Sequence, residues 1–380
     1  MFEHFFMGSN TIEHAEKYCY LGIMFNRNGS FATALDELRA KSTRALYSLK
    51  GKIMKGSLSF QSLNTLFDSL IKPVLLYGCQ ILAPHHKTMG FLSKISPDKS
   101  SDSILRYLAQ DTYEKFHLKF LKWSLGVHSK ASNIGCWGDT GRHPLFLEAS
   151  KLAIDYFERV RDLKVGPENT LLKAAFKVQQ ELNLDWFNNI TKLVNKYNTV
   201  TTSRARTSSN SLQGLRKMFI CQWKSSKESS PKLDFYNTLK TEFKPESYLH
   251  LIANHQHRAS VTRLRISCHN LYIERGRYAS PLVPREERHC LYCLTQLGLK
   301  YVESELHVLQ VCPLYSWCRR NHSPDQLTPH GVSEIFSSKN KDSVILFGKF
   351  VHSALQSNES FVQYYKLPDF HTNVGNCVIL

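Results

Sequence analysis

The hydrophobic residues of this chain recur mostly with a helical period. From Phe31 to Gly56, leucine and isoleucine return at steps of three or four residues or their multiples, as on one face of an amphipathic helix. We expect Pro73 to kink the second of the further helices, because its ring cannot continue a regular helix. The same kind of pattern predicts helices over 60–77, 107–125, 144–163 and 168–184, and a short basic helix over 216–224.

The first thirty residues have a different pattern. Residues 18–25 are rich in β-formers and residues 26–29 have turn chemistry, so we expect two short strands around a turn. Ser- and Thr-rich stretches at 96–103 and 199–210 indicate loops. The predicted fold is therefore mainly α with a small β element. We divide it into a strand-turn segment (1–30), a helical region (31–232), a small α+β region (233–345), and a C-terminal helix and tail (346–380).

The charge of the chain points to a polyanionic partner. Its 49 Lys and Arg exceed its 32 Asp and Glu, which gives a net charge of +17 and a pI of about 9.4. Such an excess favours RNA or DNA as a partner, because each phosphate that is neutralised releases a counterion. An acidic protein, a membrane surface, or a basic surface without a polyanionic partner are the alternatives.

Bases are concentrated on the first predicted helix, where no acid follows Glu37 until Asp68. Solvated lysines beside an apolar stripe are the ordinary interpretation of such a face. A helix that contacts the nucleic-acid backbone is the more specific one. Its candidate phosphate contacts are Lys41, Arg44, Lys52 and Lys55.

A second group of candidate phosphate contacts is a cluster of arginines with two interleaved tyrosines, Tyr272 and Tyr278. Arginine forks bind phosphate in pairs, and tyrosines stack on bases. Ion pairs with three neighbouring glutamates are the alternative use. The cluster consists of Arg258, Arg263, Arg265, Arg275, Arg277, Arg285 and Arg288.

The most specific chemical signal follows this cluster. Cys290 and Cys293 form a C-x2-C pair, and thirteen residues later His307 and Cys312 form H-x4-C. Zinc prefers four tetrahedral nitrogen and sulfur ligands, and a site filled by protein alone is structural rather than catalytic. We therefore predict one structural zinc ion, although four cysteine and histidine residues nearby could replace a ligand. Buried free cysteines are the alternative. The nearby residues are Cys268, His269, His289 and Cys318.

Other residues with metal-binding or targeting chemistry carry weaker signals. Glu114 and His117 have the spacing of metal ligands, but without a second pair we expect them to form a polar network in the core. The terminal residues from Cys377 fit a prenylation box, but no polybasic run precedes them. The chain lacks an apolar run of 18 residues and a signal-peptide pattern at its start. We therefore expect no membrane span and an intracellular location, in the nucleus or cytoplasm, with reduced cysteines.

Several segments together resemble the C-terminal part of LINE-type, non-LTR retrotransposon reverse transcriptases. YLGIMFNRNGSF at 20–31 is similar to the segment that leaves the family's palm, and LFDSLIKPVLLYG at 66–78 is similar to its thumb. The residues from Glu114 to Leu145 match a recurrent thumb-region pattern. RISCHNLYIERGRY, followed by the four predicted zinc ligands and Pro313, resembles the family's zinc-binding segment. The resemblance covers nearly the whole chain and implies a helical thumb-like region followed by a zinc-binding region.

The departures from this family bear on function. Family polymerases hold two metal ions with aspartates, two of them adjacent, and this sequence has no Asp-Asp pair. Neither the fingers and palm nor an endonuclease domain has a counterpart. We therefore expect no catalytic residues and predict noncatalytic binding of RNA or DNA. A protein-interaction scaffold, or part of a polymerase completed in trans by a separate reverse transcriptase core, are the alternatives.

Overall fold

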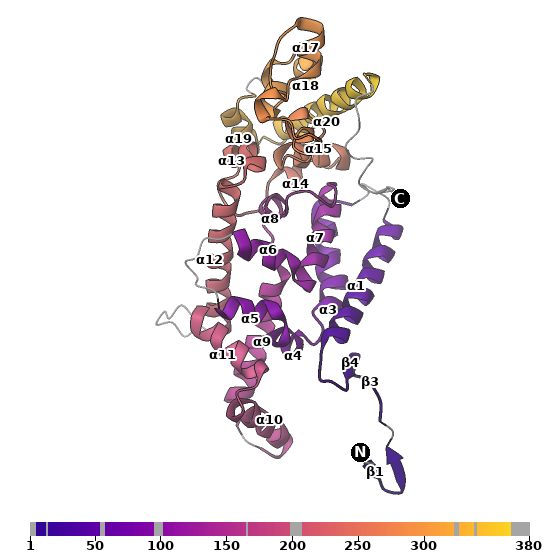
Figure 1. Ribbon diagram of the computed structural model, residues 1–380, viewed down its shortest axis with the longest axis vertical. Coiled ribbons are helices and arrows are strands. Elements are labelled where there is room, and N and C mark those ends of the chain that lie inside the picture. Colours follow the sequence, from indigo (N-terminus) through magenta and orange to yellow (C-terminus); the bar gives the residue numbers. More distant parts are fainter. Residues whose placement is uncertain are drawn as a thin grey trace.

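Helices dominate the computed structural model, and within its described part the paired strands all lie in the first 26 residues. The prediction of a mainly α fold with a small β element is therefore confirmed. In Figure 1 the molecule is elongated, with α10 towards one end and α17 and α18 at the other. The structure describes residues 5–12, 14–53, 58–94, 102–164, 166–197, 207–322, 327–337 and 340–365.

The β element consists of two separate antiparallel hairpins. The first pairs β1 (Phe5–Met7) with β2 (Asn10–Ile12), and the second pairs β3 (Lys17–Tyr20) with β4 (Ile23–Asn26). The second hairpin turns at Leu21 and Gly22, which have φ angles of 48° and 80°. Positive φ at both positions matches the twist of a two-residue hairpin. The turn between these strands was therefore predicted in the wrong place, and residues 26–29 instead lead into the first helix.

Helix α1 (Ala32–Lys52) agrees with the predicted helix up to the limit of the described residues, whereas the next helix is less regular than predicted. It consists of α2 (Phe60–Leu66), a π-helical turn (Phe67–Ile71) and α3 (Lys72–Leu75). The π-turn ends with a hydrogen bond from the Lys72 amide to the Phe67 carbonyl. The wide turn therefore lies directly before Pro73, where we predicted a kink.

The central helices agree with the predicted ranges in part. The predicted helix over 107–125 is divided at Asp111, whose carboxylate caps α7 by accepting from the amides of Tyr113 (2.9 Å) and Glu114 (3.3 Å). Helix α11 was not predicted, and α12 is longer than the short basic helix that we predicted. The central helices are α4 (Cys79–Leu82), α5 (Lys87–Lys94), α6 (Asp102–Gln110), α7 (Thr112–Leu125), α8 (Asn133–Thr140), α9 (Leu145–Asp162), α10 (Thr170–Glu181), α11 (Asp185–Tyr197) and α12 (Thr207–Glu228).

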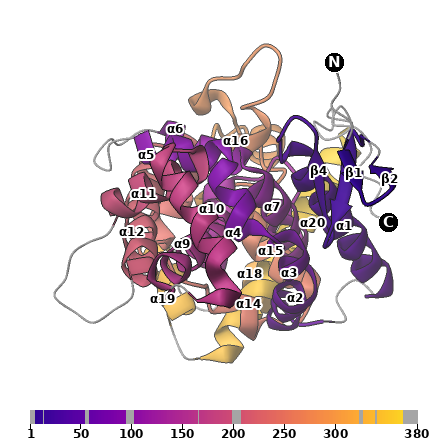
Figure 2. The same cartoon turned by 90° about the horizontal axis from the view of Figure 1, so that it is seen from below.

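The C-terminal helices are mostly short. Seen from below, they lie behind the central helices (Figure 2). The long helix α20 packs against both α15 and α18. The C-terminal helices are α13 (Asp234–Leu239), α14 (Tyr248–Leu251), α15 (His255–Arg265), α16 (Tyr272–Arg275), α17 (Leu291–Leu297), α18 (Ser316–His322), α19 (Pro329–Ser337) and α20 (Lys341–Tyr364).

A buried polar network lies within the helical core. The carboxylate of Glu114 accepts from Trp137 Nε1 (2.6 Å) and the Leu145 amide (2.7 Å), and contacts His117 Nδ1 at 3.2 Å. Arg142 donates to His117 Nε2 and forms a two-pronged ion pair with Asp68. Glu114 and His117 thus hold the connections between helices together, which confirms their prediction as polar-network residues.

The hydrophobic core is continuous along the molecule. One cluster of buried side chains extends from Leu46 to Leu355 and crosses the predicted boundary at 232/233. No single helix in the described part of the chain has the length and apolar composition to cross a membrane. The stretches Phe60–Leu75 and Cys79–His85 meet that test only together, across a bend of 58°.

Candidate metal centre and basic surface

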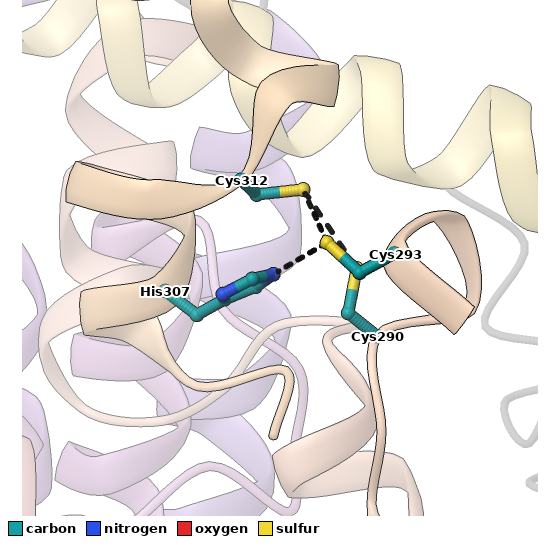
Figure 3. Close-up of side chains that lie close together, drawn as sticks. All are labelled: Cys290, Cys293, His307 and Cys312. Carbon is teal, nitrogen blue, oxygen red and sulfur yellow. Dashed lines mark hydrogen bonds between the residues drawn. The ribbon is translucent and has the colours of Figure 1, made fainter. Parts of the chain in front are cut away.

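The first half of the metal centre is a tight turn around Cys290 and Cys293. Cys290 has extended backbone angles and precedes α17, which places Cys293 in the first turn of that helix. Gly298 ends the helix at a φ of 66°, and the chain then returns so that the Cys290 amide donates to the Tyr301 carbonyl (2.7 Å). The fixed turn directs both thiol groups towards the same point (Figure 3).

The second half of the centre is a π-helical turn from His307 to Val311. In an α-helix, residues five positions apart point about 140° away from each other. A π-turn with its i→i+5 hydrogen bond places them nearly above one another. The Cys312 amide donates this bond to the His307 carbonyl (2.9 Å). Pro313 follows and keeps Cys312 extended, so His307 and Cys312 face the turn of Cys290 and Cys293.

The four side chains have the spacing of a tetrahedral metal site. Cys312 Sγ lies 3.7 Å from both Cys290 Sγ and Cys293 Sγ, and Cys293 Sγ lies 3.4 Å from His307 Nε2. All four ligand atoms lie within 4.8 Å of one another, and all four residues are buried. A regular tetrahedron with edges near 3.7 Å has its centre about 2.3 Å from each corner, which is the usual Zn–S distance. The spacing is far too long for a disulfide, whose sulfurs lie about 2.05 Å apart.

The protonation of the three thiols also favours a cation between them. A hydrogen bond from Cys312 lowers the pKa of Cys290 to about 4, and the same bond raises the pKa of Cys312 far above its ordinary value. Burial, with the charge of Cys290, raises the pKa of Cys293 to about 11. Without a cation, three packed thiols therefore hold one negative charge. Zinc binds thiolates, so a divalent ion would supply the charge that lets all three ionise.

The alternative ligands do not join this cluster. Among the described residues, the group that could hold a metal ion consists of the four predicted residues. His269 Nε2 instead contacts the Glu305 carboxylate at 3.0 Å, and Cys318 Sγ lies 4.0 Å from Ser357 Oγ. The sequence prediction of which four side chains converge is confirmed at the level of geometry.

The arginines before Cys290 are mostly interior, which corrects their prediction as a phosphate-binding surface. Arg265 is fully buried and forms ion pairs with Asp139 (3.1 Å) and Glu246 (3.1 Å). Arg258 is 1% exposed and donates to the Ile252 and Ala253 carbonyls.

Arg275 and Arg288 are each 6% exposed; Arg275 lies near Glu303, and Arg288 donates to the Val283 and Ile273 carbonyls. Phosphate contact by these four arginines was wrongly predicted, because folding turns their guanidinium groups inward.

The three more accessible arginines also have partners within the protein. Arg277 pairs with Glu274 at 3.0 Å, and the exposed Arg285 pairs with Asp234. Arg263 donates from Nε to the Gly126 carbonyl at 3.1 Å. The cluster thus ties segments together rather than presenting a row of free charges.

The bases of α1 lie at the surface beside α7. Lys41, Arg44 and Lys52 are exposed, whereas Lys55 lies outside the described residues, as does Cys377. None of these three pairs with an acid in the described part of the chain, whereas Arg39 pairs with Asp36 at 3.0 Å. The prediction that they are accessible agrees with the structure; their contact with phosphate stays a prediction.

Two aromatic residues that we did not predict as site residues lie within this surface. Tyr47 is 54% exposed, with the ammonium groups of Lys119 and Lys50 at 4.8 Å and 5.5 Å from its ring centre. Lys50 also lies 4.8 Å from the ring of Trp123. The spacing of Arg44, Tyr47 and Lys50 was a signal in the sequence, but Lys119 and Trp123 join only through packing of α1 against α7. We name Lys41, Arg44, Tyr47, Lys50, Lys52, Lys119 and Trp123 the α1–α7 surface.

Comparison with known proteins adds no relative. No protein-family model, curated protein or solved structure matches this chain.

Proposed function

We propose that this protein binds RNA or DNA without catalysing a reaction, and that one structural zinc ion stabilises its C-terminal region. The observation that carries this proposal is the position of Tyr47 between Lys50 and Lys119 on the α1–α7 surface. An exposed aromatic ring flanked by cations can stack on a base while the cations contact the adjoining phosphates. The net charge of +17 supports a polyanionic ligand.

The zinc ion belongs to this proposal because the donor set fits it. Three sulfurs and one imidazole nitrogen, all buried and at tetrahedral spacing, form a closed shell without an open position. Such an ion would have a structural role, and it would fix the segments that surround α17 and α18. The residues that would bind it are Cys290, Cys293, His307 and Cys312.

The resemblance to LINE-type reverse transcriptases gives this binding a context. On that basis the chain corresponds to the thumb and zinc-binding part, which would hold template or primer beside a separate reverse transcriptase core. The exposed aromatic residues of the two hairpins, including Phe6 (64%) and Tyr18 (63%), are compatible with a further protein surface there. The proposed partners are therefore RNA or DNA and such a core.

Fluorescence anisotropy with labelled single-stranded RNA and DNA of about 20 nucleotides would test the proposal. We expect affinity to fall steeply between about 50 and 200 mM salt, with log K linear in log salt concentration. Replacing both Arg44 and Lys119 with glutamine should reduce the slope by about 1.4, since each single-strand phosphate contact contributes about 0.7. Tyr47→Ala should weaken binding by about 1–3 kcal/mol per stacked base.

A matched control uses two exposed lysines from another part of the molecule. The double variant Lys177→Gln, Lys192→Gln removes the same charge from α10 and α11, and should leave the slope unchanged. Equal effects of the two double variants would contradict a defined site on the α1–α7 surface. Affinity that does not depend on salt would contradict nucleic-acid binding through phosphate.

One observation favours a protein-interaction scaffold as a second candidate. Apolar side chains near the metal centre are 40–59% exposed, which is typical of a surface that another protein covers. This candidate predicts no affinity for RNA or DNA even at low salt. The residues are Leu294, Leu297, Leu299, Tyr301, Val311 and Trp317.

A further inference from the structure

Helices α15 and α20 border a pocket with a volume of about 530 Å³. Its lining is mainly polar and includes Ser260 and Arg263 from α15 and His352 and Gln356 from α20. Pockets of roughly 300–1,000 Å³ hold small organic ligands. The volume therefore suits a ligand of the size of a nucleotide, and the lining suits a polar one.

Arg263 is the cation best placed to bind a ligand here. Its Nε donates to the carbonyl of Gly126, the residue that ends α7, and this bond holds the guanidinium group in place. No carboxylate in the described part of the chain forms an ion pair with Arg263, unlike Arg265 and Arg277. A guanidinium group fixed at one nitrogen can still offer its two terminal nitrogens to a phosphate in a fork.

His352 lies on the opposite wall of the pocket. Its Nδ1 is 3.1 Å from Ser260 Oγ, and its ring lies 5.0 Å from that of His257. Burial, together with the charge of Arg263, lowers the pKa of His352. The positive potential of the pocket thus opposes a second cation, and a bound anion would remove that opposition.

The other polar groups of the pocket do not change this sign. Glu359 is exposed at the rim and accepts a hydrogen bond from Asn270 Nδ2 at 3.3 Å. The first amides of α15 are satisfied by the Asn254 side chain, which accepts from Gln256 (2.9 Å) and His257 (3.1 Å). The side chains of Arg263 and His352, rather than the helix terminus, are therefore the groups that a ligand would meet.

We propose that this pocket binds a phosphomonoester, with its phosphate between Arg263 and His352. The phosphate could belong to a free nucleotide or to the end of a nucleic-acid strand. Because Gly126 ends α7, the pocket lies beyond the end of the helix that carries Lys119 and Trp123. Only the strand-end source rests on the proposed function; binding of a free nucleotide does not.

Isothermal titration calorimetry with AMP and adenosine tests the pocket on the full chain. We expect AMP to bind at least tenfold more tightly than adenosine, and Arg263→Gln to remove at least tenfold of the AMP affinity. Arg285→Gln, which removes the same charge from an exposed ion pair elsewhere, should bind AMP as the unchanged protein does. Equal affinities for AMP and adenosine, or equal behaviour of the two variants, would overturn the proposal.

A second measurement does not depend on a variant of Arg263, which also loses the bond to Gly126. In the unchanged protein, the pKa of His352 followed by NMR should rise when AMP is added, with His352→Gln identifying the signal. A signal that does not move at saturating AMP would remove His352 from the site and refute the proposed arrangement.

Two oligonucleotides separate the sources of the phosphate. A strand with a 5′-phosphate that binds more tightly than its 5′-hydroxyl counterpart, and competes with AMP, would identify the strand end as ligand. AMP binding without any oligonucleotide binding would refute the proposed function and leave the pocket standing. Loss of AMP binding while oligonucleotides still bind through the α1–α7 surface would refute the pocket alone.

Discussion

Replacing Cys290 with serine removes one of the four side chains that converge in the metal centre. Cys290 is fully buried, and its Sγ lies 3.7 Å from that of Cys312. A serine hydroxyl is shorter and does not ionise near neutral pH. We therefore expect Cys290→Ser to lose its zinc, whereas the unchanged protein should hold about one zinc ion per chain.

The expected energetic effect is large but local. Structural zinc contributes about 10–16 kcal/mol of apparent binding free energy in small peptides, which exceeds the whole stability of many domains. Here the centre also rests on other contacts, because Asn358 of α20 donates to Glu303 (2.8 Å) and Tyr315 Oη lies 3.0 Å from Asn358 Nδ2. We expect the segment from Cys290 to about Tyr315 to lose its fixed structure while α7, α9 and α12 stay folded.

Three measurements on the purified protein would check this expectation. Metal analysis should give the zinc content, and X-ray absorption should show three sulfur ligands near 2.3 Å and one nitrogen near 2.0–2.1 Å. Hydrogen exchange should show lost protection confined to the segment around the centre. Cys318→Ser is the matched control, because Cys318 is equally buried but outside the cluster.

Two results would refute the reasoning. Cys290→Ser protein with unchanged zinc content would show that Cys290 is not a ligand. Unchanged protein that contains no zinc after preparation with zinc present would show that the convergence of the four side chains has another cause.

The remaining predictions concern the interior. Arg265→Met leaves Asp139 buried without its partner and should lower the free energy of unfolding by about 3–5 kcal/mol in urea titrations, whereas Arg285→Gln should cost at most about 1 kcal/mol. Burial, assisted by the charge of Arg216, lowers the pKa of His143 to about 4 from an ordinary value of 6.5. The folded protein thus binds fewer protons at His143 than the unfolded chain between these values, so stability should fall as pH drops from about 6.5 to about 4. His143→Phe should flatten this part of the stability–pH curve, and an unchanged slope would contradict it.

Local patterns predicted the elements that depend on local patterns. The helical period predicted most of the helices, and ligand type with spacing predicted the four residues of the metal centre. Helix α11 was missed although Trp186, Ile190, Leu193 and Tyr197 carry a helical period and are buried. That signal was present in the sequence and could have been used.

The use of the arginines depended on contacts that no local pattern contains. Arg265 meets Asp139 from 126 positions away, and Arg263 meets Gly126 from 137 positions away. A run of bases in a sequence therefore does not show which charges fold inward. The same limit applies to Lys119, which joins Tyr47 across 72 positions.

The π-turn before Pro73 has a consequence for the length of its helix. Leu63, Phe67, Ile71 and Leu75 are all buried and follow one another at intervals of four. In a regular α-helix each such step overshoots a full turn by about 40°, so three steps would carry the stripe about 120° around the axis. The wide turn absorbs part of that drift and keeps all four side chains in the core. Deleting the exposed Ser69 would restore a narrow turn but rotate everything after it by about 100°. This helix therefore tolerates a different residue at Ser69 far better than a different number of residues.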